Sequence, residues 1–191
     1  MSQNKSDIRY QFTEWVKLLV SPLLFIQVQH KSKRTLQVSI PLCICSFIWS
    51  FVVLFANANF FGDSGVIKSL MELFEILIGF YIASLAAISA FSSSVLDTNL
   101  DGESFRLPDD SENLSRRQLL SLAFGYLSFS TLVLYLLGML LNLIDFNWRL
   151  QIIIGFLYMF WVSHLIVTTL FTLHYLSIKI HQPNYKPKSK D

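Results

Sequence analysis

The chain has 191 residues and a formal net charge of +2 at pH 7, and 53% of its residues are hydrophobic. Four apolar runs contain no Asp, Glu, Lys or Arg: residues 38–58, 76–96, 119–141 and 150–171. As a helix, each run is long enough to cross a hydrocarbon core of about 30 Å. Helices of a soluble domain would carry a polar stripe, and these runs are apolar on every side, so the composition excludes an ordinary soluble protein.

The first 36 residues contain a segment, residues 9–29, with apolar side chains at helical spacings of three and four: Phe12, Trp15, Val16, Leu19, Leu23 and Ile26. This spacing predicts an amphipathic helix on the cytoplasmic leaflet. Trp15 would sit at the interface, Lys17 would meet anionic headgroups, and Pro22 would bend the helix. In the alternative, the apolar face packs on the protein's own loops or on a partner.

The distribution of basic residues predicts the topology. All of the 15 Lys and Arg residues except Lys68 and Arg149 lie on one side of the membrane if that side holds both termini and residues 97–118. Because positively charged flanks resist translocation, both termini and this loop are expected to be cytoplasmic. A long polar segment precedes the first run, so no cleavable signal peptide is expected.

The predicted fold is all-α, an integral membrane four-helix bundle at residues 37–177 that includes the 97–118 loop. An N-terminal segment, residues 1–36, carries the interfacial helix. The remainder, residues 178–191, contains two prolines and four lysines, which predicts a flexible basic cytoplasmic tail.

Two acidic residues precede the second run. Glu72 and Glu75 are three residues apart and therefore share a helical face. A span beginning at Val66 would place them in the membrane, at a cost of about 2.5–3.5 kcal/mol for a carboxylate at its centre. The uncharged run 76–96 places both at or above the outer interface instead, where Trp148 fits the aromatic belt. A pore mouth or an intramembrane pairing is the alternative.

Small residues recur on the second and third predicted helices. Gly79, Ala83 and Ala87 follow at intervals of four, and Gly125 offers a similar surface on the third helix. Membrane helices associate through such seams because lipid gives no hydrophobic drive for association. The seam could lie within one chain or between copies.

The 97–118 loop holds most of the candidate docking residues. Residues 97–102 copy the first half of an EF-hand loop, but Pro108 stands where a bidentate Glu is required, which disfavours calcium binding. Ser115 and Gln118 match a capping box that would start the third helix. A docking surface for a soluble partner is expected at Asp101, Glu103, Arg106, Asp109, Asp110, Glu112, Arg116 and Arg117.

The remaining polar residues suggest no enzyme, metal or cofactor. His164 is expected to be a buried neutral imidazole that bonds a nearby Ser or Thr, with proton coupling as the alternative. Cys43 and Cys45 face different directions on one helix and are expected to be packing residues. The sequence contains no phosphate loop, HExxH helix or GxSxG elbow.

Taken whole, the chain resembles the small membrane subunit of the bacterial Kiwa anti-phage defence system in size, span layout and sequence character. The resemblance is carried by the polar residues 1–7, the Trp15 segment, the acidic stretch 97–112 and a late span with Trp161 and His164. It implies a non-enzymatic subunit of the cell inner membrane that forms a homo-oligomer, with a tetramer expected. It also implies a cytosolic DNA-binding partner protein, without direct nucleic-acid binding by this chain.

Two functions follow as hypotheses. The first is a membrane scaffold and sensor that docks its partner on the 97–118 loop and the N-terminal segment. The second is a small oligomeric channel or membrane-disrupting effector with a pore lined by polar residues: Ser92, Ser93 and Ser94, or Ser128, Ser130 and Thr131.

Overall fold

The computed structural model describes residues 23–27, 38–55, 60–62, 65–91, 96–97, 114–144 and 147–180, with the backbone alone at 27, 51–55 and 178–180. The regular elements in these residues are helices: α2 Leu24–Gln27, α3 Ile40–Phe55, α4 Val66–Ala90, α5 Arg116–Asn142 and α6 Trp148–Ile180. The all-α prediction is confirmed for this part of the chain. Residues 1–22 and 181–191, with Trp15 and Lys17, lie outside it.

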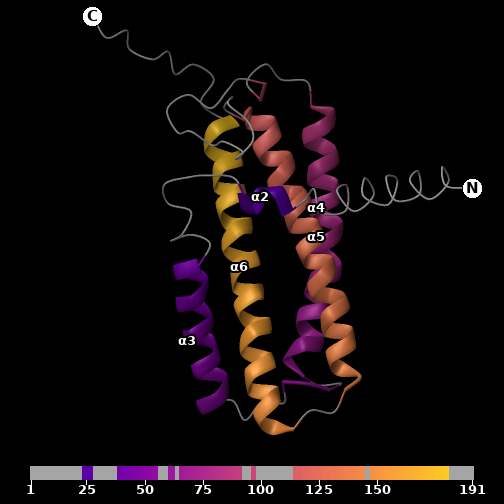
Figure 1. The fold of residues 1–191 in the computed structure, drawn as a ribbon. Coiled ribbons are helices and arrows are strands. Elements are labelled where there is room, and N and C mark those ends of the chain that lie inside the picture. The colour runs from indigo at the N-terminus through magenta and orange to yellow at the C-terminus, as the bar shows by residue number, and fades with distance from the viewer. Residues whose placement is uncertain are drawn as a thin grey trace, which may run out of the picture.

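The long helices α4, α5 and α6 run side by side, and α3 lies along α6 (Figure 1). α4 packs on α5, and α5 packs on α6. The short helix α2 crosses the bundle above the upper end of α3, and it contacts α5 (Figure 1).

A repeat of seven residues holds α4 against α5. The buried side chains of α4 are Ile67, Phe74, Tyr81 and Ile88, and a matching set on α5 comprises Leu120, Leu127, Leu134 and Leu141. Because 3.6 residues make a helical turn, every seventh residue returns to nearly the same side. Each helix therefore presents one continuous apolar seam to the other.

The second helix does not have the predicted register. It begins at Val66 and ends at Ala90, whereas the uncharged run covered 76–96. A turn fixes its start: Gly62 has φ +95°, and the Ile67 amide donates to the Phe60 carbonyl at 3.2 Å. Phe91 is extended and ends the helix. The helix bounds therefore differ from the run 76–96, and the interfacial placement of Glu72 and Glu75 stays a prediction.

The third helix begins as predicted. Ser115 accepts a hydrogen bond from the Gln118 amide, and the Gln118 side chain accepts one from the Ser115 amide, which confirms the capping box. This box satisfies two donors that a helix N-terminus otherwise leaves free.

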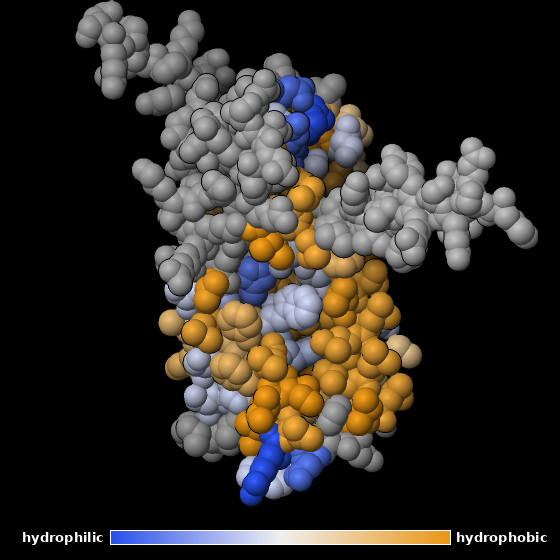
Figure 2. Space-filling model, viewed as in Figure 1, coloured by the Kyte–Doolittle hydropathy of each residue, from blue (hydrophilic) through white to orange (hydrophobic). Residues whose placement is uncertain are grey.

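Three helices are long and apolar enough to cross a membrane: Val66–Ala90, Arg116–Asn142 and Trp148–Ser177. Large apolar side chains also cover much of the surface over these helices (Figure 2). α3 has 16 residues and a length of about 24 Å, which is shorter than a hydrocarbon core of about 30 Å. A fourth span therefore remains a prediction.

Candidate functional site

Arg117 ties the start of α5 to the end of α4. Its Nε donates to Asp97 Oδ1 at 2.7 Å and its Nη2 to Asp97 Oδ2 at 3.2 Å. Its Nη1 donates to the Ile88 carbonyl at 2.8 Å, and its backbone amide to the Leu96 carbonyl at 2.9 Å. A guanidinium that bonds both oxygens of a carboxylate is held in a fixed orientation. We call this arrangement the Arg117 clasp.

The clasp has an electrostatic consequence. The hydrogen bonds from Arg117 have the largest effect and hold the pKa of Asp97 below its ordinary value of 3.8. Desolvation opposes this effect, and the charge attraction of Arg117 lowers the pKa further. Asp97 therefore stays ionised in mildly acidic solution, and the two ends of the intervening segment, 98–116, remain joined.

The predicted docking residues divide into two groups. Arg117 is engaged in the clasp, and its side chain is 23% exposed, so its role in docking stays a prediction. Arg116 is half-buried at the first position of α5. The others lie outside the described residues: Asp101, Glu103, Arg106, Asp109, Asp110 and Glu112.

The predicted small-residue seam is open in the part of the chain that the structure describes. Gly79, Ala83 and Ala87 are exposed on α4, and Gly125 is half-buried on α5. A Cβ built at Gly79 or Gly125 would meet no atom within 4 Å. Among the described residues the seam is therefore not packed within one chain, and a seam between copies stays a prediction.

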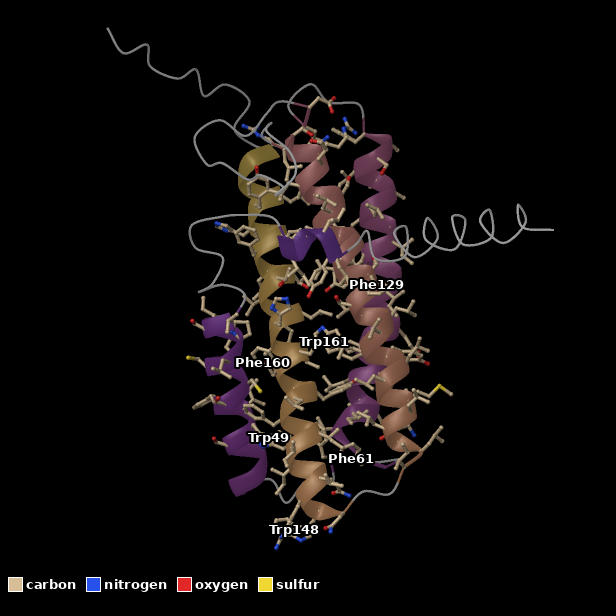
Figure 3. All side chains as sticks on the ribbon, viewed as in Figure 1. Trp49, Phe61, Phe129, Trp148, Phe160 and Trp161 are labelled. Atoms are coloured by element: carbon tan, nitrogen blue, oxygen red, sulfur yellow. The ribbon has the colours of Figure 1, made fainter. Side chains whose placement is uncertain are left out.

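Two other glycines permit close helix approach. A Cβ at Gly138 of α5 would come within 2.7 Å of the Tyr158 hydroxyl of α6. A Cβ at Gly155 of α6 would overlap the ring of Trp49, which lies with Phe160 between α3 and α6 (Figure 3). Sequence reasoning missed both because neither belongs to a repeated small-residue pattern; each is a lone glycine within an apolar run.

His164 pairs with a side chain that the sequence did not suggest. Its Nε2 lies 2.9 Å from the Tyr126 hydroxyl, which connects α6 to α5. The expected hydroxyl partners instead donate to backbone carbonyls one turn earlier in α6: Ser163, Thr168, Thr169 and Thr172. A second connection places the Tyr81 hydroxyl 2.6 Å from Thr169 Oγ1, between α4 and α6.

The described end of the N-terminal segment packs on the protein. Phe25 of α2 is buried and stacks on Tyr126, with ring centroids 5.4 Å apart. Ile26 is 43% exposed. At these positions the apolar face covers the chain's own α5, which is the alternative to a purely lipid-facing helix.

The two acidic residues of α4 are both exposed. The Tyr135 hydroxyl of α5 donates to Glu75 Oε1 at 3.0 Å. Farther along, at the start of α6, Trp148 is exposed and the Arg149 guanidinium lies 5.4 Å from its ring centroid (Figure 3). This end of the molecule thus combines acidic, basic and aromatic groups.

Among the described residues no three His, Cys, Asp or Glu side chains gather as a metal site. Cys43 is exposed and Cys45 is buried, with its Sγ 3.5 Å from the Phe156 carbonyl. Cys45 therefore packs between α3 and α6.

The helices and their apolar surface define a class: this is a helical membrane protein. Comparison with models of known protein families, with curated proteins and with solved structures finds no match.

Proposed function

We propose that the chain is a non-enzymatic scaffold and sensor subunit of an inner-membrane anti-phage defence complex, as its resemblance to the Kiwa membrane subunit implies. It forms a homo-oligomer, a tetramer by that resemblance, and recruits a cytosolic DNA-binding protein. The observation that carries this proposal is the Arg117 clasp, because it joins the two ends of the acidic loop at the ends of α4 and α5.

The charge left on the loop supports a basic partner. With Asp97 and Arg117 paired, the rest of residues 98–116 contains five acids and two arginines. DNA-binding proteins carry clustered Lys and Arg, so an acidic surface complements them. The connection between α5 and α6, residues 143–147, is too short to form a ligand-binding domain. This length agrees with a sensor that responds to the membrane rather than to a soluble ligand.

The test removes charge from the loop. Asp109→Asn with Asp110→Asn should lower capture of the partner from host cytosol by at least about tenfold, because paired charges at an interface carry several kcal/mol. The captured protein is identified by mass spectrometry and assayed for DNA binding. The control is Asp63→Asn with Asp145→Asn, which removes the same charge from the side expected to face outward. Unchanged capture by the loop variant, or a captured protein without DNA affinity, would contradict the proposal.

One observation favours the alternative function, an oligomeric channel. Glu72 and Glu75 are exposed on α4, and rings of acidic side chains line cation channels. Of the two pore linings expected from the sequence, Ser92, Ser93 and Ser94 lie outside the described residues. The other lining receives less support, since Ser130 and Thr131 are buried and Ser128 donates to the Phe124 carbonyl. Cation flux through liposomes that contain only this protein separates channel from scaffold.

A further inference from the structure

One face of α4 is not covered by the rest of the described chain. Exposed residues on this face comprise Lys68, Glu72, Glu75, Gly79, Ala83, Ala86 and Ala90. At about 100° per residue they fall within an arc of about 80°. The opposite side of α4 holds the buried seam that packs on α5. We call the exposed set the outward face of α4.

The length of α4 places its carboxylates at membrane depth. A helix of 25 residues is about 37 Å long, so a hydrocarbon core of about 30 Å leaves only about 7 Å of it outside. Glu75 is nine residues from Val66, about 14 Å along the axis. Glu75 therefore lies inside the core wherever the helix spans it, and Glu72, about 9 Å from Val66, lies about 2–9 Å inside the boundary.

Lipid is a poor environment for this face. Ionisable side chains within spans almost always face protein or water, because hydrocarbon cannot solvate them. Tyr135 supplies one hydrogen bond to Glu75, and a carboxylate can accept about four. The carboxylate of Glu75 can therefore accept further polar partners beyond Tyr135.

The rest of the face fits another helix. Gly79 and the alanines that follow leave room for a second backbone to approach closely, since a Cβ at Gly79 would meet nothing within 4 Å. Copies inserted with the same orientation place Lys68 of one chain about one turn from Glu72 of the next. The Lys68 ammonium has three donors and can serve carboxylates of both chains.

We propose that the outward face of α4 packs against the same face of a second copy of this chain, with Lys68, Glu72 and Glu75 forming a polar cluster at one end of the contact. This inference rests on the homo-oligomer in the proposed function and names its contact surface.

Oxidative cross-linking in native membranes tests the contact. In a Cys43→Ala, Cys45→Ala background, Ala83→Cys should form disulfide-linked dimers when copper phenanthroline and dioxygen accept two electrons and two protons from a pair of thiols. Ile153→Cys is the control, since Ile153 is 58% exposed on α6. Dimers at position 153 but not at position 83 would overturn the assignment, and dimers at neither position would indicate lipid or another protein on this face.

A second measurement separates this inference from the proposed function. Two differently tagged copies are co-expressed and co-purified in mild detergent. Gly79→Leu should reduce co-purification at least about fivefold, whereas Gly125→Leu should not; it adds the same side chain on α5, where a Cβ also meets nothing within 4 Å. Failure of the wild-type copies to co-purify would refute the homo-oligomer itself. Wild-type association that survives Gly79→Leu would refute the α4 contact alone.

Discussion

The contact between α3 and α6 depends on Gly155, because the Trp49 ring occupies the space that a Cβ would need. Gly155→Ala should lower the free energy of unfolding by about 1–3 kcal/mol, the usual cost of overpacking. Thermal unfolding in detergent measures this change. Gly125→Ala is the matched control and should cause no loss, since it adds the same methyl group in open space. Equal effects of the two variants would contradict the contact.

The Arg117 clasp predicts a pH dependence. The pKa of Asp97 is lowered in the folded chain, so its contribution to stability is fully present above 3.8 and is lost as the pH falls through the folded value. Wild type and Asp97→Asn should therefore differ in melting temperature by a constant amount from pH 7 to about pH 5, and the difference should shrink by pH 3. A difference that stays constant from pH 5 down to pH 3 would show that the pKa of Asp97 is not lowered in the folded chain.

Single contacts were the least predictable part of the chain. The hydrogen-bonding need of His164 was foreseen, but its Tyr126 partner lies 38 residues away, and the packing of two helices decides such a pairing. The close helix contacts at Gly138 and Gly155 were unpredictable for the same reason, since the sequence does not show which residues of other helices lie beside a single glycine.

At the scale of the elements, apolar content predicted the long helices better than it predicted their ends. The start of α5 was predictable because Ser115 and Gln118 carry a local capping signal. The start of α4 was not, since the uncharged run excludes Glu72 and Glu75. A helix begins where the backbone permits it, here after the Gly62 turn, and charge alone does not stop it.

The attachment of α2 is also testable at this scale. Phe25→Ala removes a buried ring that stacks on Tyr126, and a stacked aromatic pair contributes about 0.5–1.5 kcal/mol beyond the area it buries. Amide hydrogens of residues 24–27 should therefore exchange faster in this variant, as measured by mass spectrometry. Ile26→Ala, at a side chain 43% exposed, is the control and should leave the rate nearly unchanged. Equal rates in both variants would show that Phe25 does not hold α2 on α5.

For the whole molecule, three helices of membrane length support the membrane class, and the proposal that the protein acts through a cytoplasmic end starts from the Arg117 clasp. The membrane class was predictable because apolar length alone determines it. The polar, small-residue face of α4 was visible in the sequence, but its outward direction was not, since only the packed bundle shows which side of a helix is covered.

Cysteine accessibility across the membrane tests the scaffold most directly, because α5 separates the acidic loop from the α5–α6 connection. In the Cys43→Ala, Cys45→Ala background, Ser104→Cys and Asn147→Cys are labelled with an impermeant maleimide in sealed vesicles of known orientation. We expect Ser104→Cys to react only from the cytoplasmic side and Asn147→Cys only from the opposite side. Reaction of both from one side would show that α5 does not cross the membrane. Reversed labelling would place the acidic loop where no cytosolic partner can reach it, and either result would contradict the account.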